Sequence, residues 1–125
     1  MYRILVVDDE PSILHSLAIL LRSNEYLVDV AGTGNAAIKK GNQEKYDVLI
    51  VDLSLPDMHG FEVIEKLREQ NPQIIPMLMT GHCSREGVAE AREWGVINSF
   101  EKPFQIQSLK EAISQGIAER ALRGA

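Results

Sequence analysis

The sequence has little of what marks secreted, membrane-spanning or nucleic-acid-binding chains. Only one of its 125 residues, Cys83, is a cysteine, so no disulfide can form within the chain, which suits a reducing cytoplasm. The longest apolar run, Leu17 to Leu21, is far shorter than the roughly 20 residues that cross a bilayer. The apolar run before Asp8 is too short for a signal peptide. The net charge is −5, without the basic footprint of a nucleic-acid-binding domain. We expect a cytoplasmic protein that binds neither membrane nor nucleic acid directly.

The composition is that of an ordinary globular domain. Apolar residues make up 45% and charged residues 25% of the chain. A domain of this length buries roughly two-thirds of its unfolded surface, enough for a substantial core. No linker or low-complexity segment divides the chain. We therefore predict one domain over residues 1–125.

Short apolar runs alternate with amphipathic segments. We predict strands at residues 3–7, 26–31, 48–51, 74–79 and 97–101. We predict helices from Pro11 to the break at Asn24, at 34–45 with Gly41 weakening its second half, at 60–70, at 85–94, and from Ile106 onward. Residues 48–51 are apolar on both faces, as in a parallel sheet covered by helices on both sides. Five βα units in a row predict an α/β fold, a doubly wound five-stranded parallel sheet.

Polar side chains collect where the predicted strands end. They are Asp8, Asp9, Asp52, Thr80 and Lys102. In open α/β sheets, ligands bind at the carboxyl ends of the strands, near the point where the strand order reverses. The second strand ends without such residues, which fits an edge strand and the order 2-1-3-4-5, the flavodoxin-like arrangement. We expect the five side chains to form one site.

The chemistry of these groups favours a divalent cation and phosphoryl transfer. Three neighbouring carboxylates repel one another unless a cation neutralises them, and hard oxygen ligands favour Mg²⁺. A carboxylate can attack a phosphoryl group and form an aspartyl phosphate. Lys102 would supply positive charge and Thr80 a hydrogen bond to a phosphoryl oxygen.

Each of these segments also has a plainer explanation. Asp8 and Asp9 could be an acidic helix N-terminus, and Asp52 could start a loop. Thr80 could belong to a turn, and Lys102 could mark only the exit of a strand. The plainer explanations have to hold at four places at once, which makes them the weaker interpretation.

Four segments together resemble the receiver domains of bacterial response regulators, the family that includes the chemotaxis regulator. The segments are 4–10 (ILVVDDE), 52–60 (DLSLPDMHG), 79–81 (MTG) and 101–104 (EKPF), and the resemblance covers essentially the whole chain. It implies a domain that is not itself an enzyme but accepts a phosphoryl group from a sensor histidine kinase. It also implies an effector domain or partner protein downstream, and possible homodimerisation on phosphorylation.

The resemblance assigns a role to individual residues. Asp52 matches the phosphoacceptor, and Asp9 and Asp52 match direct ligands of Mg²⁺. Asp8 matches a ligand that acts through water, and the backbone carbonyl of Ser54 matches the group that completes the metal site. Lys102 matches the lysine that pairs with the acceptor and then with the phosphoryl group. Thr80 matches the hydroxyl that starts the switch, and the bond before Pro103 matches a cis peptide.

The chain departs from the family three residues before the lysine. Most relatives carry Tyr or Phe there, whereas this chain has Ser99, and strand parity points Phe100 to the opposite face. We expect the output surface to respond differently. His82 and Ser54 occupy positions that tune the lifetime of the phosphoryl group, and we expect no unusually fast loss of phosphate. We expect Asp57 and Gly60 to shape a loop, and His59 to be solvated.

Three alternatives stay open. The chain could be the phosphorelay receiver of a hybrid kinase. A haloacid-dehalogenase-type phosphatase shares the aspartate, lysine and Mg²⁺, but carries a second aspartate where this chain has Ser54. A pseudo-receiver used only for docking usually lacks an acidic residue or the lysine, and none is missing here.

Overall fold

A computed structural model describes residues 1–81, 90, 93, 96, 99–102 and 105–124. Its strands are β1 (Arg3–Val7), β2 (Leu27–Ala31), β3 (Val48–Asp52), β4 (Ile75–Thr80) and β5 (Ser99–Glu101). Its helices are α1 (Pro11–Arg22), α2 (Gly34–Gln43), α3 (Gly60–Gln70) and α5 (Ile106–Gly124). The helix predicted over residues 85–94 falls outside the described residues except at positions 90 and 93. The other predicted elements are found, and their described ends differ from the prediction by at most two residues. The predicted start of the last strand, residues 97 and 98, lies outside the described residues.

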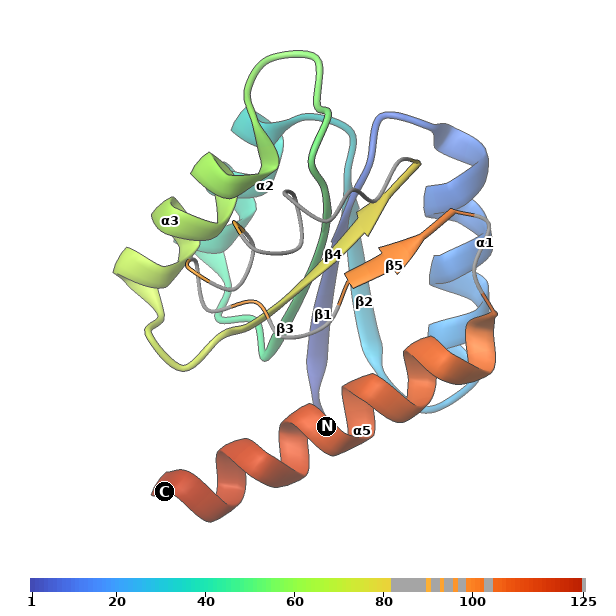
Figure 1. Cartoon of the computed structure of the whole chain (residues 1–125), viewed down its shortest axis with the longest axis vertical. Helices are drawn as coiled ribbons and strands as arrows, with labels where there is room; N and C mark the ends of the chain where they lie inside the picture. Colours follow the sequence, from blue (N-terminus) through green and yellow to red (C-terminus); the bar gives the residue numbers. More distant parts are fainter. Residues whose placement is uncertain (82–89, 91–92, 94–95, 97–98, 103–104, 125) are drawn as a thin grey trace.

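The five strands form one parallel sheet in the order β2-β1-β3-β4-β5, so the predicted fold and strand order are confirmed (Figure 1). Because the order reverses between β1 and β3, the loops after these two strands leave the sheet on opposite faces. The register aligns Val7 with Val51 and Asp52 with Met79. The residues that follow β1 and end β3 and β4 are therefore neighbours at one edge.

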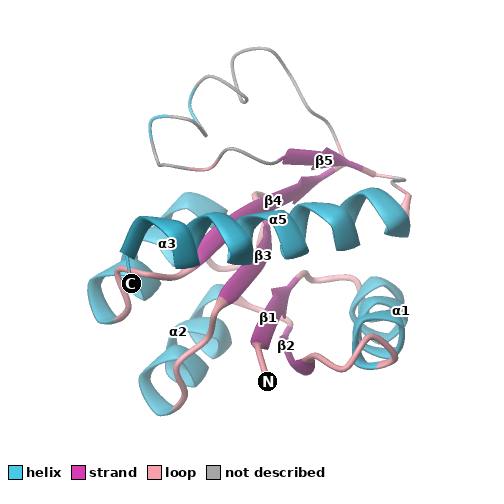
Figure 2. Cartoon of the chain, turned by 90° about the horizontal axis from the view of Figure 1, so that it is seen from below, coloured by secondary structure: helices cyan, strands magenta, loops and turns pink. Residues whose placement is uncertain are grey.

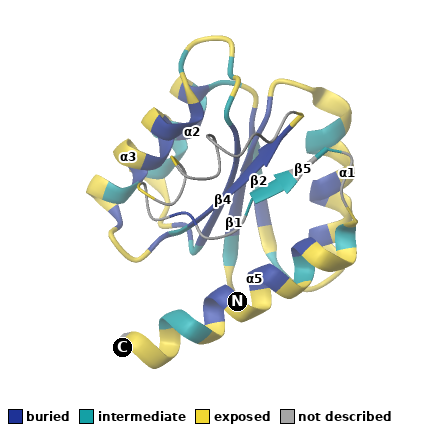
Figure 3. Ribbon diagram, in the orientation of Figure 1, coloured by how far each residue is buried: buried dark blue, intermediate teal, exposed yellow. Residues whose placement is uncertain are grey.

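Helices cover both faces of the sheet (Figure 2). The core residues of α2 and α3, including Phe61, Ile64 and Leu67, join one buried cluster, and those of α1 and α5 join the other. The central strand β3 is buried along its whole length (Figure 3). This explains why residues 48–51 show no polar face in the sequence. Burying each large side chain contributes on the order of 1.5–3 kcal/mol, so the two clusters dominate the folding energy.

Helix α5 lies across the sheet with an apolar stripe facing inward. Leu109 and Ile113 are fully buried, Ile117 nearly so, and Ile106 packs at the margin of the same cluster. In the described part of the chain, no helix combines the length and apolar character needed to cross a membrane.

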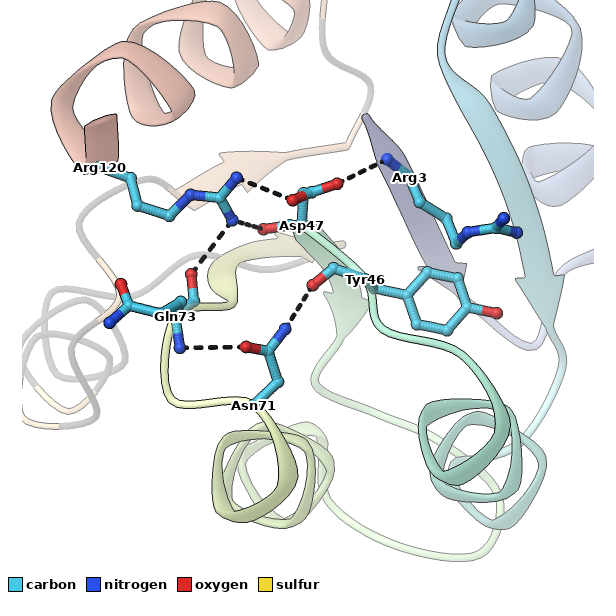
Figure 4. Close-up of polar contacts among 6 residues, drawn as sticks. All are labelled: Arg3, Tyr46, Asp47, Asn71, Gln73 and Arg120. Carbon is cyan, nitrogen blue, oxygen red and sulfur yellow. Dashed lines mark hydrogen bonds and ion pairs between the residues drawn. The ribbon is translucent and has the colours of Figure 1, made fainter. Parts of the chain in front are cut away.

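At the amino ends of the strands, polar groups join α5 to the sheet (Figure 4). Arg120 of α5 donates to the Asp47 carboxylate at 2.8 Å, and more weakly to the carbonyls of Asp47 and Gln73. The other Asp47 oxygen accepts the backbone N–H of Arg3 at 2.8 Å. Asn71, buried at the end of α3, donates to the Tyr46 carbonyl at 2.7 Å. Asp47 thus links the start of β1 to α5, at the end of the sheet opposite the predicted site.

Candidate functional site

The carboxyl edge of the sheet brings together the five side chains that the sequence singles out. Asp52 and Thr80 are the last residues of β3 and β4, and Asp8 and Lys102 follow directly after β1 and β5. The ladder of backbone hydrogen bonds continues past the strands, from Asp8 N–H to the Ala31 carbonyl at 3.1 Å and from Lys102 N–H to the Thr80 carbonyl at 2.7 Å. The sheet itself therefore fixes the backbone of these residues.

The Lys102 ammonium lies among three carboxylates. Its Nζ is 2.6 Å from Asp8 Oδ2, 3.1 Å from Asp52 Oδ2 and 3.6 Å from Glu10 Oε1. Asp8 is fully buried and the Asp52 side chain is 8% exposed, so both carboxylates depend on nearby positive charge. Glu10 is exposed, and its contact with Lys102 is correspondingly weak.

Burial and charge act in opposite directions on Lys102. Burial alone would lower the pKa of its ammonium, but the hydrogen bonds that it donates to Asp8 and Asp52, together with the charges of these carboxylates, outweigh burial and raise the pKa above its ordinary value. Lys102 is therefore a permanent cation at neutral pH.

The described residues at this edge carry more negative than positive charge. Asp8, Asp9, Glu10 and Asp52 supply four carboxylates, against the single ammonium of Lys102. Ligand oxygens of Asp8, Asp9 and Glu10 all lie within 4.8 Å of one another. Glu10 is not among the predicted site residues, although the acidic run at 8–10 is a signal in the sequence that points to it. An acidic, all-oxygen donor set of this kind fits a hard divalent cation such as Mg²⁺.

Asp9, Glu10, Asp52 and Lys102 line a pocket of about 460 Å³, and Asp8 lies buried behind it. The lining of the pocket also includes Ser54, His59 and Thr80. The Ser54 N–H donates to Asp52 Oδ1 at 3.2 Å, so the carboxylate is held by the loop on one side and by Lys102 on the other. The pocket is large enough for a phosphoryl group beside Asp52.

The β3–α3 loop, residues 53–59, forms one wall of this pocket. His59 is exposed, as expected, but it also caps α3, because its Nδ1 accepts the N–H of Phe61 at 3.2 Å. Gly60 donates its N–H to the Leu53 carbonyl at 2.8 Å. A Cβ at Gly60 would lie 2.5 Å from the Asp52 carbonyl oxygen, so the close return of the chain requires glycine.

Four further residues of the sequence analysis do not line the pocket or lie outside the described residues. Ser99 is half-buried in β5, where it pairs with Leu78. Phe100 packs against the cluster under α1 and α5, on the face opposite to that of Leu78, in agreement with the expected strand parity. His82 and Pro103 lie outside the described residues.

Known proteins resemble the chain along most of its length. The model of the response regulator receiver domain family matches residues 4–114. The probable transcriptional regulatory protein TcrX of Mycobacterium tuberculosis is 34% identical over 106 residues, which are 85% of this chain but only 45% of that protein. The chain thus spans less than half the length of this relative.

Two solved structures share the fold over nearly the whole chain. A CheY-like response regulator receiver domain protein from Methanospirillum hungatei is 31% identical, with a TM-score of 0.93 and 99% of both chains covered. The response regulator TrrA from Thermotoga maritima, solved in complex with Mg²⁺ and BeF, is 32% identical with a TM-score of 0.82, covering 93% of this chain and 99% of that one.

Proposed function

The chain belongs to the response regulator receiver domain family of two-component signalling, and from this premise we propose that Asp52 is its phosphoacceptor. Receiver domains are typically signalling domains and not enzymes. A sensor histidine kinase is the partner that the family implies. In the reaction we propose, an Asp52 carboxylate oxygen attacks phosphorus, the P–N bond of a phosphohistidine breaks, and its electron pair leaves with the imidazole.

The position of the Asp52 side chain carries this proposal. It is 8% exposed, lines the 460 Å³ pocket, and lies 3.1 Å from the Lys102 ammonium. A mostly buried nucleophile that lines a pocket favours a small reactant. The nearby cation favours a reactant that carries negative charge.

The acidic residues fit Mg²⁺, which is present in the solved structure of the relative TrrA. In this proposal Asp9, Asp52 and the Ser54 carbonyl hold the ion directly, and Asp8 holds it through water. The ion would offset the negative charge of the phosphoryl oxygens as they approach three carboxylates.

Lys102 and Thr80 complete the proposed chemistry. Before transfer the Lys102 ammonium pairs with the Asp52 carboxylate. After transfer it pairs with a phosphoryl oxygen, and its hydrogen bond to Asp52 becomes weaker. Thr80 is 7% exposed and lines the same pocket, so its hydroxyl can donate to the phosphoryl group and transmit its presence along β4. Because Ser99 is smaller than an aromatic side chain, we propose that the output surface does not use an inward aromatic rotation.

This chain offers a groove beside the Asp52 pocket, and we propose that the kinase docks there. A mostly apolar groove of about 530 Å³ runs along α1 and shares Glu10, Gly81 and Lys102 with the Asp52 pocket. Ile13, Leu17 and Leu20 of α1 line it. A helical partner seated there would present its phosphohistidine at the mouth of the pocket.

The relative TcrX is more than twice as long as the part of it that this chain matches. This supports the proposal that residues 1–125 are the receiver domain of a larger regulator.

The proposal is tested with a small phosphodonor and Mg²⁺, followed by the intact mass of the protein. We expect a stable gain of one phosphoryl group in the parent and in the exposed control Glu62→Gln, and none in Asp52→Asn. Continuous release of phosphate would indicate a phosphatase. A folded parent that never gains mass would indicate a pseudo-receiver and refute the proposal.

A further inference from the structure

We propose that Asp57 is a positioning residue for the cation site, because it fastens the β3–α3 loop that carries Ser54 to the N-terminus of α2. The inference rests on the proposed function, since Ser54 matters here as a source of a metal-binding carbonyl. Asp57 itself does not line the pocket.

Both oxygens of Asp57 are used in this contact. Oδ1 accepts the N–H of Gly34 and Oδ2 accepts the N–H of Asn35, each at 2.8 Å. The two donors are 23 and 22 residues away in sequence, so the bonds join separate parts of the fold. The bonds from Asn35 and Gly34 also lower the pKa of the Asp57 carboxyl, which shows that they favour its ionised form. A carboxylate at the positive end of a ten-residue helix gains further from the helix dipole.

Packing reinforces the same contact. Met58, the next residue, is half-buried and packs against the core cluster under α2 and α3. Its side chain occupies the space where a Cβ of Gly34 would stand. The tip of the loop is thus held by two hydrogen bonds and one apolar contact, all at the first residues of α2.

The base of the loop is closed independently of this contact. Ser54 and His59 form an isolated antiparallel bridge, and Gly60 donates to the Leu53 carbonyl. Leu53, Leu55 and Met58 pack against the core cluster under α2 and α3, whereas the residues between them, Ser54, Pro56 and Asp57, are exposed. Without the Asp57 bonds, the exposed tip loses its link to α2, and the direction of the Ser54 carbonyl is set only by the bridge to His59 and the packing of the neighbouring leucines.

Thr33 offers a matched control. Its Oγ1 accepts the N–H of Ala36 at 3.0 Å, so it caps the same helix as Asp57 does. Thr33, however, lies in the segment just before α2, and its cap bond does not involve the β3–α3 loop. Loss of either side chain weakens the start of α2, but only the loss of Asp57 releases the loop.

The test compares Asp57→Ala, Asp57→Asn and Thr33→Ala with the parent in a Mg²⁺ titration followed by backbone amide chemical shifts. We expect Asp57→Ala to bind Mg²⁺ about tenfold more weakly, the size of effect seen when groups that orient metal ligands are removed. Asp57→Asn keeps one acceptor oxygen and should fall between Asp57→Ala and the parent. Thr33→Ala should bind Mg²⁺ like the parent although it unfolds more easily.

The outcomes separate this inference from the proposed function. A parent that does not bind Mg²⁺ overturns both. A parent that binds the ion, with Asp57→Ala binding it equally well, overturns only the positioning role. The positioning role is also overturned if Thr33→Ala and Asp57→Ala weaken Mg²⁺ binding equally, because the weaker binding then comes from the damaged start of α2 and not from the released loop. If Asp57→Ala does not fold, the isosteric Asp57→Asn decides by the same criteria.

Discussion

Replacing Lys102 by methionine removes the one positive charge that the structure places among the buried carboxylates of the site. Methionine keeps much of the length and apolar stem of lysine, so packing changes little. Asp8 Oδ2, now 2.6 Å from the ammonium, and Asp52 Oδ2, at 3.1 Å, lose their cation together. Breaking a buried ion pair by removing one member costs about 3–5 kcal/mol.

Proton uptake limits this cost. A carboxyl that has lost its cation can bind a proton, and at pH 7 protonating an ordinary aspartate costs about 4 kcal/mol, roughly three pH units at about 1.4 kcal/mol each. At pH 5 the same limit is about 1.5 kcal/mol. The folded Lys102→Met protein then binds more protons than its unfolded chain, so its stability falls as pH rises. We expect the variant to be less stable than the parent by about 3 kcal/mol at pH 7 and by about half of that at pH 5.

Urea unfolding in a chelator, at the two pH values, measures both numbers. Lys66→Met, on the exposed side of α3, is the control and should change stability by less than about 0.5 kcal/mol. Saturating Mg²⁺ should restore part of the loss in Lys102→Met, because the ion replaces the missing charge. If the variant is as stable as the parent in chelator at pH 7, the buried carboxylates do not depend on Lys102 and the argument fails.

Three other predictions concern single side chains. Arg120→Ala should lower the free energy of unfolding by about 1.5 kcal/mol, because one charged hydrogen bond to Asp47 is lost at a partly exposed site, and an unchanged urea midpoint would contradict this. Asp57→Asn should be less stable than the parent at neutral pH. The lowered pKa of Asp57 means that its contribution is complete above the unfolded value of about 3.9 and is lost as pH falls through the folded value, so the difference should vanish in acid. Asp9→Asn should be at least as stable as the parent in chelator but gain less thermal stability from Mg²⁺, and an equal gain would remove Asp9 from the proposed ligands.

The fold follows from local patterns that the sequence displays openly. Val48–Val51, apolar on both faces, predicts a central parallel strand, and the structure buries all four residues completely. The second strand is not followed by residues comparable to those of the site, which predicts its place at the edge of the sheet, and the strand order confirms that place. Because parallel strands bring their carboxyl ends to one side, residues as far apart as Asp8 and Lys102 could be expected to meet.

Contacts that depend on the path of a loop could not be predicted in the same way. The sequence suggests that Asp57 shapes its own loop, but its hydrogen bonds go to α2, more than 20 residues away. His59 was expected to be solvated, and its additional role as the cap of α3 follows from a local geometry that histidine seldom provides. Arg120 donates a hydrogen bond to Asp47, which lies 73 residues earlier in the sequence, and no spacing rule connects the two residues.

The balance of positive and negative side chains differs between the two ends of the sheet, and this difference indicates where a charged ligand would bind. At the amino end, Arg3 and Arg120 each approach carboxylates of Asp29 or Asp47, so positive and negative groups pair within the chain. At the carboxyl end, within the part of the chain that the structure describes, the carboxylates of Asp8, Glu10 and Asp52 share the ammonium of Lys102. Folding alone gives no reason to gather like charges, since their repulsion lowers stability. Among the described residues this end of the sheet is short of positive charge, and a divalent cation bound from solution, as proposed above, would supply it.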